Sequence, residues 1–235
     1  MRLRVSIILI ISIVSTAPLF AAGQTHIIWP AGSILSDVQL EMFGGADSFF
    51  LSEEISDDMF SRIEGVSYAR GCSVPRSRLR LLHLLHRNFR GHIQVGEMIC
   101  NKSVADDLLR IFREHYDVGY PIEKIYLIDE YGADDNLSMA DNNTSCFNFR
   151  RKPGMKELSM HARGLAVDIN PLYNPYVRGE RIEPASGAVY ADRTRKCPYY
   201  IRRGDACHAA FTSRGWSWGG SWRSARDWQH FEKKQ

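Results

Sequence analysis

The order of the hydrophobic patterns along this chain of 235 residues limits the folds that it can adopt. Two helical patterns come early: Ser77–Phe89 has leucines at helical spacing, and a second helix begins after Ser103 and ends at Tyr120. Ser103 and Asp106 form a capping-box-like start for that second helix. Short strand patterns follow at Lys124–Asp129, Ser145–Arg150, Leu165–Ile169 and Trp228–Glu232. This order lacks the alternating strand–helix rhythm of a parallel sheet, so it predicts an α+β fold with a small antiparallel sheet flanked by helices.

Length and composition predict one globular domain. A chain of 235 residues with 44% hydrophobic residues can bury a sizeable core and is short for two domains. We expect a single domain over residues 24–235, with its core over about residues 70–235, and a monomeric protein. Residues 134–144 are polar and residues 171–204 are rich in Pro, Gly and Arg, so both segments are predicted to be irregular.

The start of the chain has the pattern of a secretory signal peptide. Arg2 and Arg4 form a positive start, Val5–Ile13 is an apolar run with one serine, and small residues follow. A membrane anchor is the alternative, but this run is shorter than the roughly 20 residues that a span needs. We therefore expect residues 1–23 to be cleaved, leaving a secreted or periplasmic protein without a stable membrane span.

The charge of the mature chain argues against a nucleic-acid partner. The full chain has a net charge of +3, with 30 basic and 27 acidic residues. Cleavage of residues 1–23 removes two arginines and no acid, which leaves 28 basic and 27 acidic residues. A nucleic-acid-binding protein needs a strongly basic stripe, and this near balance does not provide one.

The five cysteines would reach an oxidising compartment if the protein is exported. Cys197 and Cys207 bracket a short loop, and we predict a disulfide between them. Cys72 and Cys100 are a second possible pair, and Cys146 then stays unpaired because five cysteines cannot all pair within one chain. The alternative is that all five are reduced and buried.

The segment from Ser159 to Asp168 carries the strongest signal for chemistry. His161 comes just before a glycine turn, and Asp168 lies in the strand Leu165–Ile169. Alternation along that strand puts Asp168 on the same face as the small Ala166, which leaves room for a ligand. A carboxylate in an apolar strand is costly unless something pairs with it, and a metal ion would do so.

A second signal lies near the end of the chain, around His230. Two histidines and one aspartate, namely His161, His230 and Asp168, give three protein ligands and leave a fourth position for water. This is the pattern of a catalytic zinc site rather than a closed structural one. A nearby carboxylate can take a proton from the water, and Asp227 is the first candidate, with Glu232 as the alternative.

Other residues with chemical potential have simpler interpretations. His83 and His86 would lie on one face of the first predicted helix, but no nearby carboxylate completes a ligand set, so we interpret them as helix surface. Trp216, Trp218 and Trp222 alternate with glycines and form either core or the wall of a groove, since glycine lets the backbone pass close to a neighbour.

These motifs resemble a known superfamily. They are the run S-x-H-x-x-G-x-A-x-D from Ser159, the stretch G-W-x-W-G-G-x-W from Gly215 and the ending D-x-x-H-F-E from Asp227. They look like the zinc peptidoglycan peptidases, which include D-alanyl-D-alanine carboxypeptidases, vancomycin-resistance D,D-dipeptidases and L-alanyl-D-glutamate endopeptidases. The resemblance implies the hedgehog/DD-peptidase fold, Zn²⁺ as cofactor and a peptidoglycan stem peptide as substrate.

The resemblance also implies roles for individual residues. The zinc ligands of the superfamily fall on His161, Asp168 and His230, and its catalytic carboxylate falls on Asp227. An upstream arginine that binds substrate or the oxyanion matches Arg150, whose alternative interpretation is a surface charge or a pair with the acidic loop 134–141. The further candidate substrate contacts are Ser145 and Trp228.

The function that the sequence predicts is zinc-assisted amide hydrolysis in peptidoglycan, for cell-wall remodelling or lysis. The choice between D-alanyl-D-alanine carboxypeptidase and L-alanyl-D-glutamate endopeptidase stays open. A non-catalytic zinc-containing binding module on the same fold is the alternative function, because hedgehog proteins resemble these peptidases without being peptidases. A structural protein that uses all these residues as core is disfavoured by the three-ligand pattern.

Overall fold

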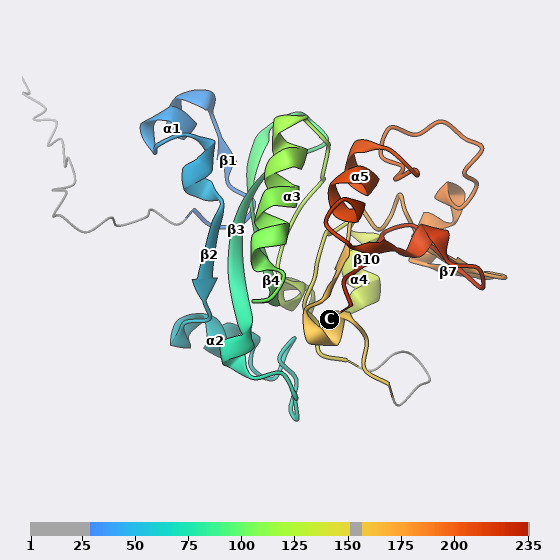
Figure 1. Ribbon diagram of the computed structural model, residues 1–235, viewed down its shortest axis with the longest axis horizontal. Coiled ribbons are helices and arrows are strands. Elements are labelled where there is room, and N and C mark those ends of the chain that lie inside the picture. The colour runs from blue at the N-terminus through green and yellow to red at the C-terminus, as the bar shows by residue number, and fades with distance from the viewer. Residues whose placement is uncertain (1–28, 151–156, 235) are drawn as a thin grey trace, which may run out of the picture.

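The computed structural model describes residues 29–150 and 157–234 and combines short helices with three small antiparallel sheets (Figure 1). The predicted α+β class is therefore confirmed. The expected signal peptide, residues 1–23, lies outside the described residues. Within the described residues, no helix combines the length and the apolar character that crossing a membrane requires.

The first sheet has four strands in the order β1-β4-β3-β2. Its central strands are the long hairpin of β3 (Leu79–Arg87) and β4 (Ile93–Asn101), and its edges are β1 (Ile34–Leu35) and β2 (Leu51–Glu54). Helix α3 (Ala105–Asp117) packs against β3, and two short helices, α1 (Asp37–Met42) and α2 (Asp57–Ile63), precede it in the chain. The N-terminal residues therefore complete this sheet.

The predicted helix Ser77–Phe89 is wrong, because this segment forms strand β3. Nearly every side chain of β3 is buried, since α3 covers one face and N-terminal residues cover the other. A strand covered on both faces has no polar alternation, so its leucines also fit a helical spacing. His83 and His86 consequently point to opposite faces: His83 contacts Glu53, and His86 bonds to a backbone carbonyl.

The second predicted helix is confirmed as α3, with Leu108, Ile111 and Phe112 fully buried against the sheet. Its capping differs from the prediction, because Val104 is the N-cap residue and makes no side-chain cap. The side chain of Asn101 instead accepts hydrogen bonds from both the backbone nitrogen and the hydroxyl of Ser103.

Two three-stranded sheets make up the C-terminal half. One has the order β5-β10-β8, with β5 (Ala166–Asp168), β8 (Ser217–Trp218) and β10 (His230–Glu232). The other has the order β7-β6-β9, with β6 (Tyr176–Arg178), β7 (Arg181–Glu183) and β9 (Arg226–Asp227). The strands predicted at 165–169 and 228–232 are thus confirmed, and they pair with each other.

Several shorter predictions need correction. The segments 124–129 and 145–150 form single β-bridges, at Lys124 and Ser145, rather than strands, because the backbone partners of each segment lie on several different elements. Helix α4 (Asp135–Ala140) lies within the segment 134–144, where the Asp134 side chain accepts hydrogen bonds from two backbone nitrogens. The segment 171–204 contains the β6–β7 hairpin, and helix α5 (Ala206–Thr212) follows it.

The predicted disulfide between Cys197 and Cys207 is not formed in this structure, and neither is the possible pair of Cys72 and Cys100. All five cysteines lie within the described residues, and all five are free. Cys207 is fully buried on the core-facing side of α5, whereas Cys197 lies partly exposed in the preceding loop. Burial raises the pKa of the Cys207 thiol well above its usual value, so this residue acts as a small apolar side chain. The alternative interpretation of reduced and mostly buried cysteines is the one that fits.

Candidate metal centre

The elements around β5 and β10 position three candidate ligands. His161 opens a single turn of 3₁₀-helix (His161–Arg163) that ends at Gly164 in a left-handed conformation. A side chain at Gly164 would meet the backbone nitrogen of Asn101 at 2.6 Å, so the turn requires glycine. The chain then enters β5, where Asp168 lies directly opposite His230 of β10.

The three candidate ligands converge on one point. The distances are 3.2 Å from His161 Nε2 to His230 Nδ1, 3.2 Å from His161 Nε2 to Asp168 Oδ2, and 3.0 Å from His230 Nδ1 to Asp168 Oδ1. Two ligands at about 2.05 Å from a tetrahedral zinc lie roughly 3.3 Å apart. Two nitrogens and one carboxylate with this spacing fit zinc, so these residues would hold the metal.

Neighbouring acceptors fix the orientation of both imidazoles. Nδ1 of His161 lies 2.7 Å from the carbonyl oxygen of Cys146, which accepts its proton and leaves Nε2 free to bind a metal. Nε2 of His230 lies 3.4 Å from a carboxylate oxygen of Glu232, which leaves Nδ1 for the metal. Glu232, the alternative base in the sequence, therefore contacts the far side of the His230 ring.

The electrostatics of the cluster keep Asp168 ionised. Burial by itself would raise the pKa of Asp168, but the charges and hydrogen bonds of His161 and His230 hold that pKa well below its usual range. Burial likewise opposes a charge on His230, but the hydrogen bonds that Asp168 and Glu232 accept from its ring outweigh burial and raise the pKa of His230 to about 10. The negative charge of Asp168 between the two imidazoles therefore favours a cation at this position.

Asp227 lies in β9, beside this cluster. Its Oδ1 is buried and has no hydrogen-bond partner among the described residues. Burial raises the pKa of Asp227 to about 7, with a lowering contribution from His230 and raising contributions from Asp168 and Glu183. A carboxylate with an unpartnered oxygen and a pKa near neutrality is suited to accept and return a proton.

The tryptophan–glycine stretch forms both core and wall. A side chain at Gly219 would come within 2.7 Å of the Asp227 carbonyl oxygen and 3.3 Å of the His230 Cβ. Gly219 therefore allows the stretch to lie directly against both residues. Trp218 packs in the core. Trp222 lines the surface groove that also contains His161, Asp168 and His230, and its ring centroid lies 5.4 Å from that of His230.

Arg150 lies in the same groove as the metal cluster, as the sequence predicts. Its guanidinium forms an ion pair with Asp135 of α4, and its positive charge lowers the pKa of Asp227. Asp135 also accepts a hydrogen bond from the side chain of Asn148. Arg150 is thus tied in place at one side of the groove rather than pointing away from the cluster.

Ser145 and Trp228 are not among the residues that line the groove, and their role as substrate contacts stays a prediction. Ser145 exchanges two backbone hydrogen bonds with Asp168 and therefore supports that ligand from behind. Trp228 packs partly buried against the core, with the guanidinium of Arg193 over its ring at 4.7 Å. Both residues stabilise the elements that carry the ligands.

The groove has a volume of about 580 Å³, and one of its walls is the β6–β7 hairpin, which the sequence analysis missed. The signal was present in the sequence as Y-V-R-G-E-R-I-E, where two alternating runs flank a Gly-containing turn. The hairpin adds Tyr176, Arg178, Arg181 and Glu183 to the groove. The hairpin was not predicted because the segment 171–204 is long and its composition is that of an irregular loop.

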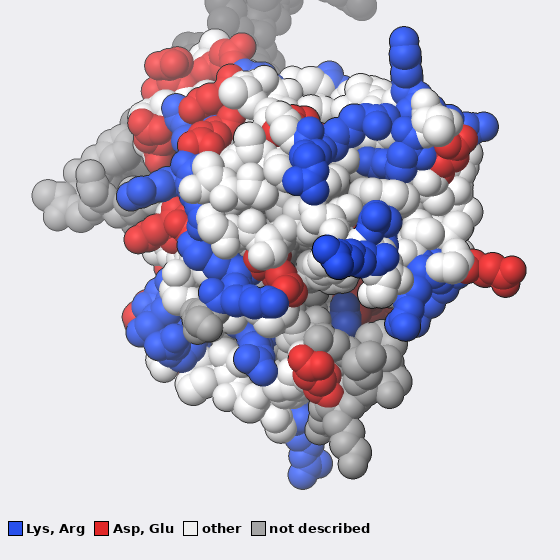
Figure 2. Space-filling view, turned by 45° about the vertical axis from the view of Figure 1, so that its right-hand side comes forward, with Lys and Arg blue, Asp and Glu red and all other residues white. Residues whose placement is uncertain are grey.

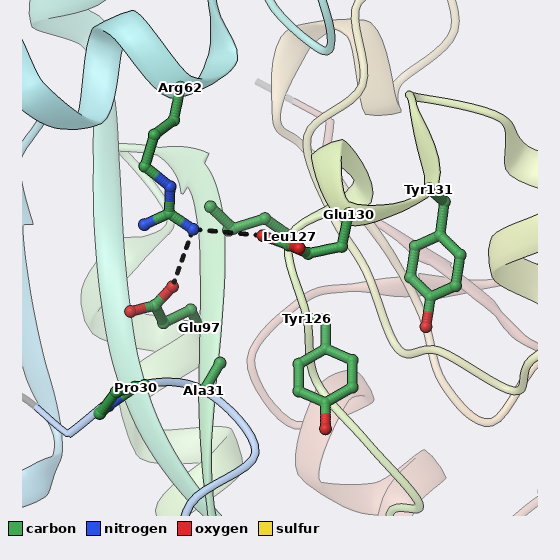
Figure 3. Close-up of a pocket in the computed structure, with 8 residues that line it drawn as sticks. All are labelled: Pro30, Ala31, Arg62, Glu97, Tyr126, Leu127, Glu130 and Tyr131. Atoms are coloured by element: carbon green, nitrogen blue, oxygen red, sulfur yellow. Dashed lines mark hydrogen bonds and ion pairs between the residues drawn. The ribbon is translucent and has the colours of Figure 1, made fainter.

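A second cavity, of about 650 Å³, lies between α2, β4 and residues 126–131 (Figure 3). Figure 3 shows Arg62 between two acids: it donates to Glu130 at 3.3 Å and pairs with Glu97 at 3.9 Å. Its lining has no histidine and no cysteine, and both of its acids pair with Arg62. We interpret this cavity as a structural junction, so the chemistry lies in the groove around His161 and His230.

Comparison with known proteins supports this assignment. Residues 153–233 match a family model described as D-alanyl-D-alanine carboxypeptidase. The match confirms the predicted resemblance to the zinc peptidoglycan peptidase superfamily and supports peptidase activity. It includes His161, Asp168, Asp227 and His230, and the β6–β7 hairpin as well. No curated protein and no solved structure matches the chain.

Proposed function

We propose that this protein is a zinc-dependent peptidase that hydrolyses a peptide bond in peptidoglycan stem peptides. The observation that carries the proposal is the convergence of His161, Asp168 and His230, one ligand atom from each of which lies within 4.8 Å of the others. The unpartnered carboxylate of Asp227 in the same groove supplies the base that hydrolysis needs. The family match over residues 153–233 supports the same activity.

Different groups in the groove have different roles in amide hydrolysis. When bound, zinc supplies Lewis acidity, which lowers the pKa of water and polarises the peptide carbonyl. Asp227 accepts a proton from the attacking water and returns it to the leaving amine, which its pKa of about 7 favours at neutral pH. Asp168, held as an anion by its two histidine neighbours, keeps the ligand set negatively charged.

Arg150 stabilises the oxygen anion that develops on the substrate. Its ion pair with Asp135 fixes the guanidinium at the edge of the groove, and a fixed donor costs little reorganisation during the reaction. The same ion pair already satisfies much of its charge, so Arg150 is less suited to hold a free substrate carboxylate. Of the two roles that the sequence left open, we therefore favour the oxyanion donor.

The substrate class rests on the family match, which supports action on peptidoglycan outside the cytoplasm or in the periplasm. Both a D-alanyl-D-alanine carboxypeptidase and an L-alanyl-D-glutamate endopeptidase fit an open groove of about 580 Å³. A zinc-containing binding module is the alternative function. It would have no need of Asp227, whose buried and unpartnered oxygen costs stability, so this residue favours the peptidase.

The test is to incubate the purified mature chain with defined muropeptides, with and without a chelator, and to read the product masses. We expect one hydrolysed bond, a mass gain of one water, and loss of activity with the chelator that added zinc restores. Binding of muropeptides without any hydrolysis, in a zinc-loaded protein, would support the binding module instead.

A further inference from the structure

One face of the small sheet β7-β6-β9 forms a continuous wall of the groove. Directly opposite residues in antiparallel strands place their side chains on the same face. The pairs are Tyr176 with Glu183, Tyr176 with Asp227, and Arg178 with Arg181. These five residues therefore share one face, which we call the hairpin face, and all five line the groove.

The alternate residues of the same strands lie on the other face. Val177 pairs with both Ile182 and Arg226, and none of these three residues lines the groove. The sheet thus separates two sets of arginines with different surroundings. Arg178 and Arg181 face the groove that holds the metal cluster, whereas Arg226 faces away from it.

The arginines of the groove differ in how far their charge is already balanced. Arg181 donates two hydrogen bonds to a carboxylate oxygen of Glu183, at 2.9 and 2.6 Å. Arg150 is paired with Asp135. Arg178 is exposed, and within the described part of the chain its guanidinium has no hydrogen-bond or ion-pair partner. Arg178 is therefore the arginine of the wall with a charge available to a ligand.

The position of Arg178 relative to the base is set by the strand register. Asp227 lies opposite Tyr176, and Arg178 comes two residues later on the same strand. Two residues span about 7 Å along a strand, and a peptide substrate advances by a similar amount for two residues. A group bound by Arg178 is therefore one or two substrate residues away from the bond beside Asp227.

The charge distribution of the molecule agrees with an anionic substrate. Residues 171–234 carry twelve Lys and Arg against six Asp and Glu, whereas residues 29–70 carry two against eight. Figure 2, in which the right-hand side of Figure 1 comes forward, shows Lys and Arg spread over much of this face and a cluster of acids at its upper left. Such a distribution attracts an acidic ligand toward the groove.

We propose that Arg178 recognises a free carboxylate on the substrate, so that the groove selects peptides with an acidic group within two residues of the scissile bond. A guanidinium binds a carboxylate through two parallel hydrogen bonds, which gives orientation as well as affinity. The hairpin would then hold this carboxylate at a set distance from Asp227. This proposal rests on the proposed function, because it assigns specificity at that same groove.

The test compares pairs of synthetic stem peptides that differ at one position, with a carboxylate either free or amidated. In the wild type we expect KM to be lower for the free acid. Arg178→Gln should raise KM for the acid about tenfold, leave KM for the amide nearly unchanged, and leave kcat for both nearly unchanged. Arg226→Gln is the matched control, because it removes the same charge from the opposite face of the same sheet.

The outcomes separate this proposal from the proposed function. If the wild type cleaves peptides but Arg178→Gln changes acid and amide alike, or Arg226→Gln has the same effect, the hairpin proposal is wrong and the peptidase stands. If the wild type cleaves nothing, the peptidase proposal fails. The dissociation constants of the same peptides then test Arg178 directly, and equal constants in wild type and Arg178→Gln overturn its role.

Discussion

The metal centre depends on a few side chains whose neighbours fix both their charge and their orientation. Asp168 pairs its backbone with Ser145 on one side and with His230 on the other, so its carboxylate has little freedom to move. The carbonyl of Cys146 fixes the tautomer of His161. Because of these contacts, we expect the ligands to keep their positions in the absence of metal. Substitution of one ligand should then mainly reduce the metal affinity.

We expect His161→Ala and His230→Ala to abolish zinc binding. Each substitution leaves two ligands of three, which is too few for a catalytic zinc site. Elemental analysis should give about one zinc per chain for the wild type and close to none for either variant. His92→Ala is the control, because it removes an exposed histidine in the β3–β4 turn. Full zinc occupancy in both ligand variants would refute the assigned centre.

Asp227→Asn should keep its zinc and lose turnover by about 10²–10⁴-fold, since the amide cannot accept a proton. Burial raises the pKa of Asp227 to about 7, and the base works only when ionised. Activity should therefore fall as the pH falls through that pKa. The positive charge of bound zinc lowers it, so we expect the midpoint of the acidic limb of kcat/KM below about 7.

Glu232→Gln distinguishes the two candidate bases. Glu232 contacts the ring of His230 at 3.4 Å, so its loss should weaken metal binding more than it slows a zinc-saturated enzyme. An inactive, zinc-loaded Glu232→Gln beside an active Asp227→Asn would reverse the two roles. An acidic limb with its midpoint above 7 would argue against Asp227 as the base.

At the scale of elements, the centre depends on how closely the tryptophan–glycine stretch approaches β9 and β10. Gly219→Ala would place a Cβ 2.7 Å from the Asp227 carbonyl oxygen, so β9 or the stretch must shift. We expect about 1–3 kcal/mol of lost stability and, because the base moves, a loss of activity on the order of 10²-fold. Thermal unfolding and kcat/KM measure these effects.

The control for Gly219→Ala is Ser221→Ala, two residues later in the same turn. Ser221 is exposed, and its hydroxyl accepts a hydrogen bond from Arg203 at the surface. Its loss should change stability by no more than about 0.5 kcal/mol and leave activity unchanged. Equal effects of the two substitutions would mean that the close approach of Gly219 has no special importance for the base.

The same elements explain how much of the structure the sequence could predict. Strands β5 and β10 could be predicted because each is a short apolar run that contains a charged residue or a candidate metal ligand. In Leu165–Ile169 that residue is Asp168. The helix predicted at Ser77–Phe89 failed because a strand buried on both faces loses its alternation. The hairpin that carries Arg178 was missed because its strands are only three residues long.

Site residues follow the same rule. The candidate metal ligands and Asp227 lie in short motifs, so the sequence alone is enough to propose them. The side-chain surroundings depend on tertiary packing, so the sequence offered pairing with the acidic loop 134–141 only as one alternative for Arg150 and gave no sign that Trp228 packs beneath Arg193. The same limit applies to Cys197 and Cys207, whose loop spacing is compatible with a disulfide although the fold leaves both thiols free.

At the scale of the whole molecule, the N-terminal residues complete the first sheet, although the sequence predicts a core that begins at about residue 70. Strand β1 covers the free edge of β4, and β2 covers the free edge of β3. Leu35, Leu40 and Phe49 pack against Leu85 and its neighbours in one buried cluster. Removal of this layer exposes two strand edges together with an apolar surface, which is the combination that leads to aggregation.

We therefore predict that residues 29–235 fold as a soluble unit and that residues 70–235 do not. Both chains contain every candidate ligand, so a difference between them reflects the first sheet rather than the metal site. The longer chain should elute as a monomer, unfold in one cooperative transition and bind about one zinc. The shorter chain should aggregate or lose its near-ultraviolet circular dichroism, with or without added zinc. A monomeric and cooperatively unfolding 70–235 chain would contradict this prediction, because it would mean that β3 and β4 are stable with both outer edges exposed.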